Sequence, residues 1–348
     1  MFSFFKPFIF KLDPEMAHDL AIKSLKYNFI PEDVFKVSDE HLLETKLFDK
    51  TLKNPIGLAA GFDKSAEVYN SLFKLGFGFV EVGTITPKQQ FGNLKPRIFR
   101  LEKDKALINR LGFNNDGLRI VSERLRKNLP SGILGINIGP NKNTKSRIDD
   151  YLICLEGLHN YSDYITINIS SPNTPGLREF HEEKYLNKLL SEIDLFLKKN
   201  KITKPVVIKI SPDIEDKEIS YIIELLKKFK IKGIIISNTT DSHRKNLISK
   251  HKKEEGGLSG EPISQISNIL IKKFYREIQK EIIIIGVGGV NSGQSAFDKL
   301  KSGASLFQLY TGMIYEGPGV VKKIKKELID IFKKENIKNL NEVIGAGT

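Results

Sequence analysis

The sequence of 348 residues has few of the side chains that build disulfides and metal centres. It contains one cysteine, Cys154, no tryptophan, and six scattered histidines. A single thiol cannot form an internal disulfide, and it cannot supply an all-cysteine zinc or iron–sulfur site. The histidines show no HExxH or similar ligand spacing. The sequence therefore predicts no metal site and no disulfide framework.

Long hydrophobic runs are also missing. A transmembrane helix needs about 18 or more consecutive apolar residues, and the longest uncharged apolar run, 282–290, is far shorter and contains three glycines. The hydrophobic content of 40% is ample for a packed core. We expect an intracellular globular protein that is either soluble or peripheral to a membrane.

The chain is basic, with 55 Lys and Arg against 42 Asp and Glu, a net charge of +13. Many of the lysines lie in amphipathic patterns such as 321–334, where Val321, Ile324, Leu328 and Ile331 recur at helical spacing. No zinc-finger, RNP or KH motif is present. We therefore interpret the charge as a solvated surface and expect no nucleic-acid partner, while an affinity for anionic membranes stays open.

The amino terminus is unusually aromatic, with five phenylalanines among residues 1–11. It lacks the long apolar run and the small-residue cleavage site of a signal peptide. Pro7 interrupts any long helix, and Asp13 followed by Pro14 predicts the start of a second one. Its apolar stripe is expected to consist of Ala17, Leu20, Ala21 and Leu25. The apolar face either packs on the main domain or, as we favour, lies in a membrane interface.

Eight short runs rich in β-branched residues alternate with helical patterns along the chain. The expected strands are 54–60, 77–83, 133–138, 164–169, 205–210, 233–237, 282–287 and 305–309. The expected helices are 63–75, 115–128, 185–199, 215–229, 263–279, 292–301 and 318–335. Eight such units predict an α/β fold, a (β/α)8 TIM barrel, with an open doubly wound sheet as the alternative. The 49 residues from Thr84 to Gly132 are too long for one crossover and must hold an inserted loop region or small strands.

Polar and glycine residues stand at the end of each expected strand. They are Gly61–Lys64, Thr84, Asn137, Asn168, Lys209, Asn238–Thr239, Gly288–Gly289 and Tyr310–Gly312. One such residue is usually a turn or capping residue, but in a barrel all eight groups would meet at the carboxyl-terminal mouth, where barrel enzymes keep their chemistry. The turns at 286–289 and 310–312 suit a phosphate group, although they do not form a GxGxxG motif. Without a metal set, an FMN-type flavin is the natural candidate.

The segment from Asn168 to Arg178, NISSPNTPGLR, resembles the dihydroorotate dehydrogenases of the quinone-dependent, membrane-associated class. Further matching motifs cover nearly the whole chain. They are LDPEMAHDL (12–20), NPIGLAAGFDK (54–64), EVGTITP (81–87), KPRIFRL (95–101), INRLGFNN (108–115), GINIG (135–139), SNTT (237–240), GGLSGEP (256–262), IIGVGGV (284–290) and LYTGMIYEGP (309–318). The resemblance implies a small amino-terminal helical element, residues 1–40, ahead of an FMN-binding barrel, residues 41–348.

The resemblance also implies a reaction, the oxidation of (S)-dihydroorotate to orotate in pyrimidine biosynthesis. Hydride would pass from C6 of the substrate to N5 of one FMN per chain, and then electrons to a quinone, either ubiquinone or menaquinone. Ser171 stands at the position of the base that takes the C5 proton. Because an unassisted hydroxyl is a poor base, Ser171 must act through a relay or in a desolvated site. Soluble classes carry cysteine at this position, whereas Cys154 lies outside the motif.

Site residues follow from the same resemblance. The substrate-binding set is Lys64, Asn109, Arg110, Leu111, Gly112, Phe113, Asn168, Asn173, Asn238 and Thr239. The FMN-binding set is Ala60, Gly61, Phe62, Asp63, Lys64, Thr84, Asn137, Asn168, Lys209, Ser237, Gly260, Gly289, Tyr310 and Thr311. The quinone-binding set is His18, Arg100 and Tyr310. Asparagine amides both donate and accept, which suits a ring of alternating C=O and N–H groups. Lys209 is expected near flavin N1, and Ser237 replaces the threonine expected at that position.

The implied setting is a monomer on the cytoplasmic side of a bacterial inner membrane, bound through its amino-terminal helices. Two alternatives stay open. One is another FMN-barrel dehydrogenase, including a soluble relative coupled to fumarate or NAD. The other is a basic binding module without catalysis, which would explain the charge but none of the strand-end residues.

Overall fold

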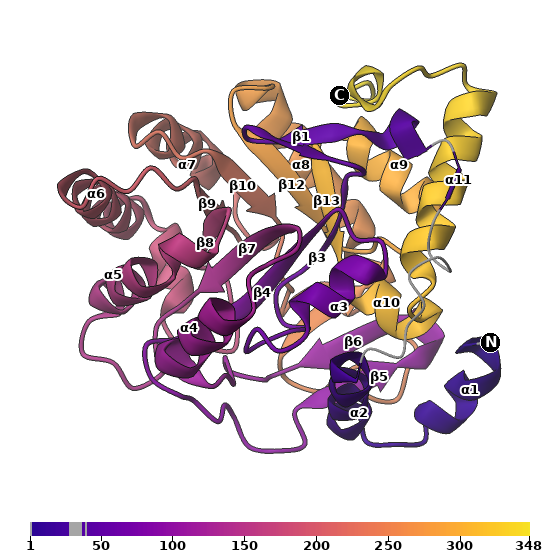
Figure 1. Ribbon diagram of the computed structural model, residues 1–348, viewed down its shortest axis with the longest axis horizontal. Coiled ribbons are helices and arrows are strands. Elements are labelled where there is room, and N and C mark those ends of the chain that lie inside the picture. Colours follow the sequence, from indigo (N-terminus) through magenta and orange to yellow (C-terminus); the bar gives the residue numbers. More distant parts are fainter. Residues whose placement is uncertain (1, 28–36, 39) are drawn as a thin grey trace.

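Eight parallel strands form a closed barrel in the computed structural model, which describes residues 2–27, 37–38 and 40–348 (Figure 1). The strands are β3 (Ile56–Leu58), β4 (Phe79–Ile85), β7 (Ile133–Ile138), β8 (Tyr164–Asn168), β9 (Val206–Lys209), β10 (Gly233–Ile236), β12 (Ile283–Val287) and β13 (Leu306–Leu309). Their order around the barrel is β10-β12-β13-β3-β4-β7-β8-β9. Each overlaps one expected strand, so the predicted TIM barrel is confirmed and the open sheet is excluded.

Helices surround the barrel. They are α3 (Tyr69–Lys74), α4 (Gly117–Lys127), α5 (Arg147–Leu158), α6 (Glu183–Lys199), α7 (Asp216–Lys228), α8 (Ser264–Ile278), α9 (Gly293–Lys301), α10 (Thr311–Glu316) and α11 (Val320–Lys334). The sequence patterns missed α5 and α10. In α5, the Ser146 side chain caps the start, and Tyr151, Cys154, Leu155 and Leu158 bury one face at helical spacing. Its polar opening residues hid this periodicity.

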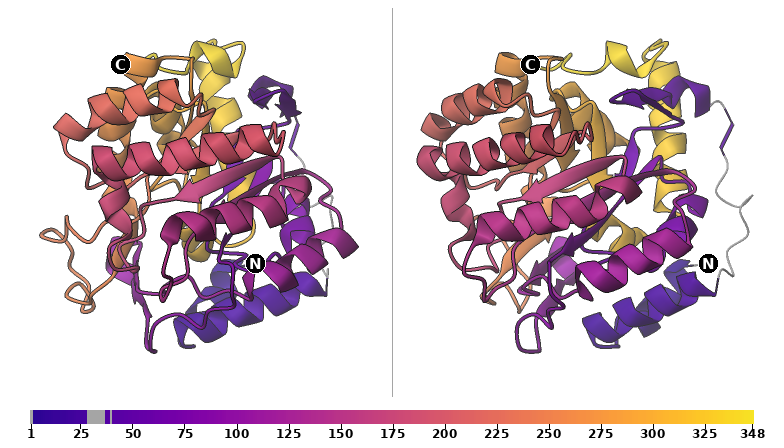
Figure 2. Two further views of the ribbon diagram at one scale, coloured as in Figure 1. Left: turned by 90° about the vertical axis from the view of Figure 1, so that its left-hand side faces the viewer. Right: turned by 60° about the vertical axis from the view of Figure 1, so that its left-hand side comes forward.

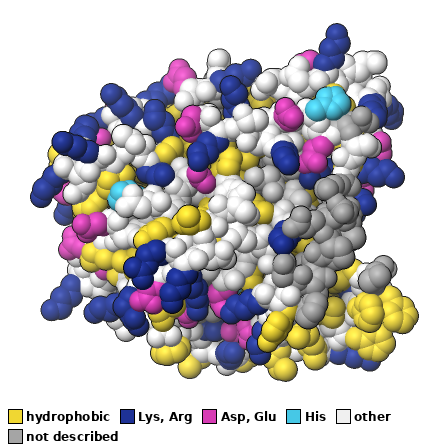
Figure 3. Space-filling view, in the orientation of Figure 1, with side chains coloured by type: hydrophobic (Ala, Val, Ile, Leu, Met, Phe, Trp, Pro, Cys, Tyr) yellow, Lys and Arg dark blue, Asp and Glu magenta, His cyan; other side chains and the backbone are white. Residues whose placement is uncertain are grey.

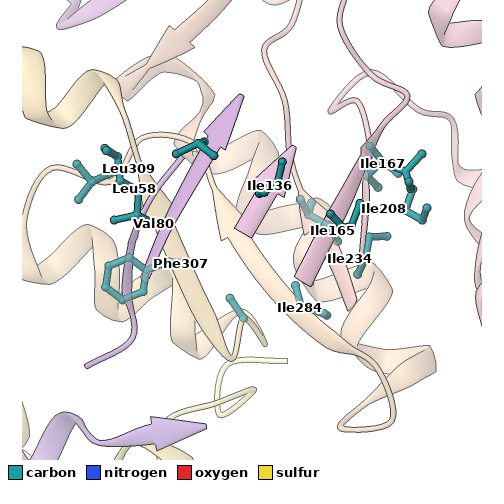
Figure 4. Close-up of a cluster of buried hydrophobic side chains, with 14 of the residues drawn as sticks. Leu58, Val80, Ile136, Ile165, Ile167, Ile208, Ile234, Ile284, Phe307 and Leu309 are labelled. Atoms are coloured by element: carbon teal, nitrogen blue, oxygen red, sulfur yellow. The ribbon is translucent and has the colours of Figure 1, made fainter. Parts of the chain in front are cut away.

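The alternation of side chains along β8 shows how the wall separates two environments. Ile165 and Ile167 belong to the core that packs against the surrounding helices (Figure 4). Tyr164, Thr166 and Asn168 point to the other face, into the barrel, because side chains alternate along a strand. The barrel interior is therefore filled in layers, as in other barrels of this type.

The layer of side chains at the amino-terminal end of the barrel interior is apolar. It is covered by a β-hairpin that the sequence patterns did not predict. The hairpin consists of β1 (Thr45–Leu47) and β2 (Lys50–Leu52). Its Leu47 and Leu52 pack on side chains from the beginnings of the barrel strands, namely Phe79, Tyr164, Val207, Ile235, Ile285 and Leu306. The amino-terminal end of the barrel is thus plugged by side chains, and open space remains at the opposite end.

A three-stranded antiparallel sheet covers that opposite end. It is formed by β5 (Ile98–Leu101), β6 (Ala106–Asn109) and β11 (Gly257–Gly260) in the order β11-β6-β5. Two of its strands come from residues 84–132, which confirms the small strands expected there. Helix α2 (Pro14–Lys26) contacts β5, and both views of Figure 2 show α1 (Phe2–Ile9) and α2 at the end of the molecule away from the β1–β2 hairpin.

The expected start of α2 is confirmed. The Asp13 carboxylate accepts hydrogen bonds from the Glu15 and Met16 amides at 2.9 and 3.1 Å. The expected apolar stripe is divided between two surroundings, because Leu25 is 5% exposed and Leu20 is 53% exposed. Ile22 and Leu25 are the buried residues of α2. They are three residues apart and therefore lie on the same face of the helix, the one that faces the barrel. Pro7 lies inside α1, which ends two residues later at Ile9. Residues 1, 28–36 and 39 of the predicted 1–40 element lie outside the described residues.

Candidate active site

A pocket lies between the carboxyl ends of the barrel strands and the three-stranded sheet. It encloses about 1,300 Å³ of space, including open solvent at its mouth. Expected site residues that line it are Ala60, Gly61, Lys64, Thr84, Asn109, Leu111, Gly112, Phe113, Asn168, Ser171, Asn173, Lys209, Ser237, Asn238, Thr239, Gly260, Gly289, Tyr310 and Thr311. The fold therefore gathers residues from the ends of seven barrel strands, all but β7, and from the inserted sheet at one place.

Several expected site residues lie behind the lining. The Asp63 carboxylate accepts hydrogen bonds from the Glu67 and Val68 amides at 2.7 and 2.8 Å, so it fixes the turn after β3. Burial raises the pKa of Asp63. Arg110 does not line the pocket, and its guanidinium group pairs with Glu254 at 3.0 Å.

The floor of the pocket is a buried polar layer centred on Glu81. One carboxylate oxygen accepts a hydrogen bond from Asn137 Nδ2 at 2.9 Å. The other accepts from the Tyr164 hydroxyl, Thr166 Oγ1 and Gln308 Nε2 at 3.0 to 3.1 Å. Glu81 and Gln308 were not expected from the sequence. The sequence signal that could have found them is that each is a polar residue within an otherwise apolar expected strand, 77–83 for Glu81 and 305–309 for Gln308.

Asn137 connects this layer to the pocket. Its Oδ1 accepts hydrogen bonds from Thr84 Oγ1 at 2.6 Å and from Asn168 Nδ2 at 3.1 Å. Asn137 does not line the pocket, but it orients Thr84 and Asn168, which do. Buried hydrogen-bond networks of this kind rigidify a site.

Lys209 reaches the pocket from the end of β9. Burial lowers the pKa of Lys209, and the negative charge of Glu81 acts in the opposite direction. Among the described residues, none accepts a hydrogen bond from its ammonium group. A buried cation without a hydrogen-bonded partner is costly, so this site favours an acceptor or an anion in the pocket.

A second lysine, Lys64, joins the pocket to the amino-terminal helices. Its Nζ lies 3.1 Å from Nε2 of His18 on α2. Burial lowers the pKa of Lys64 to about 8. Burial and the charge of Lys64 lower the pKa of His18 to about 3. At neutral pH His18 is therefore a neutral imidazole that accepts a hydrogen bond from the Lys64 ammonium.

The loop after β8 places Ser171 and Asn173 opposite the inserted sheet. Ser171 is buried, and its hydroxyl oxygen accepts a hydrogen bond from the Asn173 amide at 3.3 Å. The Asn173 side chain donates to Asn109 Oδ1 at 3.3 Å. No titratable side chain in the described part of the chain lies within hydrogen-bond distance of Ser171 Oγ. Ser171 thus stands in a desolvated site with neutral amide neighbours.

Arg178 ties this loop to the loop after β10. Its guanidinium group donates to the Ser170 and Thr239 carbonyl oxygens at 3.2 and 3.1 Å. It also pairs with Asp213 and Asp241, both at 3.1 Å. These bonds hold the two loops that carry the pocket asparagines in one arrangement.

Glycines shape the side of the pocket after β12. Gly289 has a φ of 76°, and a Cβ there would lie 2.4 Å from Ser264 Cβ. This turn therefore requires glycine, and the backbone is open to a ligand. Two neighbouring buried atoms, Ser237 Oγ and Gln308 Oε1, have no hydrogen-bond partner in the described protein. Unsatisfied buried polar atoms in a pocket indicate that a polar ligand completes it.

The expected quinone-binding residues occupy different places. His18, Phe62 and Tyr310 form a row of rings from α2 to the pocket, with centroid distances of 5.1 and 6.2 Å. Arg100 does not line the pocket, since it donates to the Phe10 and Leu12 carbonyl oxygens at 3.2 and 2.8 Å. It therefore anchors the connection between α1 and α2 to β5.

The helices at this end present apolar side chains to the outside. The exposed fractions are 71% for Phe4, 61% for Phe8 and 61% for Met16. Figure 3 shows hydrophobic side chains gathered over α1. A contiguous exposed apolar patch indicates an interaction surface. Among the described helices, none combines the length and apolar character that crossing a bilayer requires. In the same part of the chain, no group of three or more His, Cys, Asp or Glu could hold a metal ion.

Comparison with known proteins gives one consistent match. The family model for dihydroorotate dehydrogenase matches residues 42–332. A dihydroorotate dehydrogenase (quinone) of Bartonella tribocorum is 48% identical over 339 residues, covering 96% of this chain and 93% of that protein. The corresponding protein of Bartonella henselae is 46% identical over 336 residues, covering 95% and 92%.

Solved structures agree with this match. DHODH from Eimeria tenella in complex with ferulenol has a TM-score of 0.90 at 37% identity, covering 96% of this chain and 95% of that one. The ligand-free form has a TM-score of 0.89 at 38% identity, covering 96% and 99%.

Proposed function

Because the chain belongs to the dihydroorotate dehydrogenase family, in its quinone-dependent class, we propose that it oxidises (S)-dihydroorotate to orotate with one bound FMN and a membrane quinone. The observation that carries this proposal is the convergence of Lys64, Ser171, Lys209 and Gly289 on one pocket. These residues come from four separate parts of the chain, and a binding module without catalysis would not require them together.

The residues present fit FMN. The glycine turn at Gly288–Gly289 offers backbone to a phosphate group, and Lys209 offers a positive charge to the flavin ring. The unpartnered Ser237 Oγ and Gln308 Oε1 offer a donor and an acceptor. When bound, FMN supplies an acceptor for the hydride from dihydroorotate C6 and a donor of electrons to the quinone.

The amide side chains around the pocket fit the substrate ring. Asn109 and Asn173 are bonded to each other at 3.3 Å, and Asn238 Nδ2 is held by Ser170 Oγ at 2.9 Å. Held in this way, they present fixed donors and acceptors to the ring amides and carbonyls. Lys64 pairs with the substrate carboxylate, whose negative charge raises the pKa of Lys64 and keeps its ammonium group protonated.

Ser171 takes the C5 proton. Its Oγ lies in a buried site and accepts a hydrogen bond from the Asn173 backbone N–H. This hydrogen bond stabilises the negative charge that develops on Oγ as the hydroxyl loses its own proton. Since no titratable side chain of the described chain contacts Ser171 Oγ, water relays that proton onward. This assignment agrees with the absence of cysteine from the motif.

The quinone reaches the flavin through the amino-terminal helices. The exposed apolar side chains of α1 and α2 insert into the cytoplasmic face of a bacterial inner membrane, where the quinone is dissolved. His18 and Tyr310 line the path between that surface and the pocket, and Arg100 holds the turn between the helices. The protein acts there as a monomer.

Anaerobic mixing tests the proposal. The purified protein is expected to be yellow, and dihydroorotate should bleach its flavin absorbance. A following pulse of ubiquinone or menaquinone should restore it. Bleaching that only fumarate or NAD reverses would place the protein with the soluble relatives. A colourless protein that does not bind added FMN would refute the proposal.

A further inference from the structure

Lys299 is a buried charged side chain that the proposed function does not use. It lies on α9 and is 0% exposed. Its Nζ donates a hydrogen bond to Ser267 Oγ at 3.1 Å. Lys325, another buried lysine, pairs with Glu40, but Lys299 forms no salt bridge with any described residue. Burial lowers the pKa of Lys299 to about 7.

The fold makes room for this side chain at a specific glycine. A Cβ on Gly286 of β12 would lie 2.6 Å from both Cγ and Cδ of Lys299. The stem of the lysine therefore crosses β12 where that strand has no side chain. The first glycine of the 286–289 turn thus accommodates Lys299, and it does not have to contact a ligand.

Ser267 connects Lys299 to the strand ends. Its hydroxyl donates to the Val287 carbonyl oxygen at 2.6 Å, and the Ile236 carbonyl oxygen lies 3.3 Å away. These carbonyls end β12 and β10, and the residues that follow them line the pocket. A Cβ on Gly288 would lie 3.3 Å from Ser267 Cβ. Lys299 and Ser267 therefore lie directly behind the glycine turn.

A buried ammonium group without an anionic partner is costly, because burial removes its hydration. An anion held on the pocket side of the Gly288–Gly289 turn would offset this cost, since charges interact strongly across a region of low dielectric constant. Lys299 and Ser267 also hold the ends of β10 and β12 together. The ammonium group and the Gly288–Gly289 turn are therefore fixed relative to each other.

We propose that Lys299, through Ser267, is a positioning residue that supplies the positive charge behind the anion subsite at Gly288–Gly289 and thereby selects a phosphorylated flavin over an unphosphorylated one. This inference rests on the proposed function, because FMN is the anion that the subsite would hold. It assigns to α8 and α9 a role in choosing the cofactor, although neither Lys299 nor Ser267 touches the pocket.

The test compares two ligands that differ only in the phosphate group. The full chain, stripped of flavin, is titrated with FMN and with riboflavin, and binding is followed by flavin fluorescence. Lys299→Met should weaken FMN binding at least tenfold and riboflavin binding less than threefold. Lys301→Met, a neighbour on the same helix with its ammonium over the Phe297 ring, is the matched control and should change neither.

A second variant covers the case in which Lys299→Met does not fold. Ser267→Ala keeps the charge but releases it from the strand ends, and it should weaken FMN binding about threefold with riboflavin binding unchanged. Equal losses for both flavins would reveal a purely structural role and overturn the inference, as would no loss for either. Failure of the unaltered chain to bind FMN would instead overturn the proposed function.

Discussion

At the scale of single residues, the pocket depends on charged groups held away from water. Lys64 and Lys209 both have a lowered pKa because they are buried. Their positions could be predicted from the sequence, since each follows a strand. The partner of Lys64 could not, because its contact with His18 joins residues 46 apart through the docking of α2. Glu81 was missed for the same reason, since its importance comes from three other strands.

Replacing Ser171 with alanine should slow flavin reduction at least a hundredfold, because the C5 proton would lose its acceptor. Orotate binding should stay within about threefold of the unaltered protein, since the pocket asparagines remain. Stopped-flow absorbance gives the rate, and a titration with orotate gives the affinity. Ser122→Ala, on α4 away from the pocket with its hydroxyl bonded to the Arg119 carbonyl oxygen, is the control and should change neither quantity. An unchanged reduction rate in Ser171→Ala would remove this residue from its role.

The affinity for orotate should fall as pH rises through about 8. In the ligand-free protein burial lowers the pKa of Lys64 to about 8 from 10.5, so the ammonium is present below that pH and lost above it. The carboxylate of orotate then loses its positive partner. Titrations between pH 6.5 and 9.5 measure the effect, and Lys64→Met should bind weakly with little change over this range. A constant affinity across the range in the unaltered protein would contradict the role given to Lys64.

At the scale of elements, the most informative parts are those that lie outside the eight β/α units. The β1–β2 hairpin, the three-stranded sheet and the amino-terminal helices close the two ends of the barrel. The sequence indicated the helices, through Asp13 and Pro14, and small strands between residues 84 and 132. The hairpin could not be predicted from the sequence, since strands of three residues are too short to show a periodic pattern. Helix α2 was predicted, but its buried side was not, since Leu20 and Leu25 differ only in what packs against them.

Replacing Phe4 and Phe8 together with serine should weaken binding to vesicles of anionic phospholipid at least tenfold, because both rings are exposed and add apolar burial in the interface. Sedimentation with the vesicles measures this binding. Reoxidation by a vesicle-borne quinone should slow as well, while flavin reduction by dihydroorotate stays unchanged. Leu195→Ser, at an exposed apolar residue on α6, should have no effect. Normal vesicle binding by the double variant would exclude α1 as the membrane contact.

At the scale of the whole molecule, the barrel joins its strands through one buried carboxylate. Glu81 of β4 accepts hydrogen bonds from side chains of β7, β8 and β13. The fold class could be predicted because eight β-branched runs alternate with helical patterns. The interior layers could not, because they depend on which side of each strand faces inward once the barrel closes.

Glu81→Gln should reduce the free energy of unfolding by about 2–4 kcal/mol, because an amide donor would face three groups that now donate to the carboxylate. Urea unfolding followed by circular dichroism measures the change. Glu123→Gln, at a surface ion pair with Arg119, should change the free energy by less than about 0.5 kcal/mol. A midpoint equal to that of the unaltered chain would show that the carboxylate is dispensable for stability.

The two chain ends lie apart, with the carboxyl end at the end of the molecule that also holds the β1–β2 hairpin, and α1 toward the other end (Figures 1 and 2). This separation bears on how the protein is handled. A purification tag or a surface linker attached after Thr348 stands clear of the apolar face. A tag or linker attached before Phe2 would instead lie next to the exposed apolar side chains of α1. Protein immobilised on a sensor chip through its carboxyl end would therefore have one orientation, with the exposed apolar side chains of α1 and α2 toward the analyte.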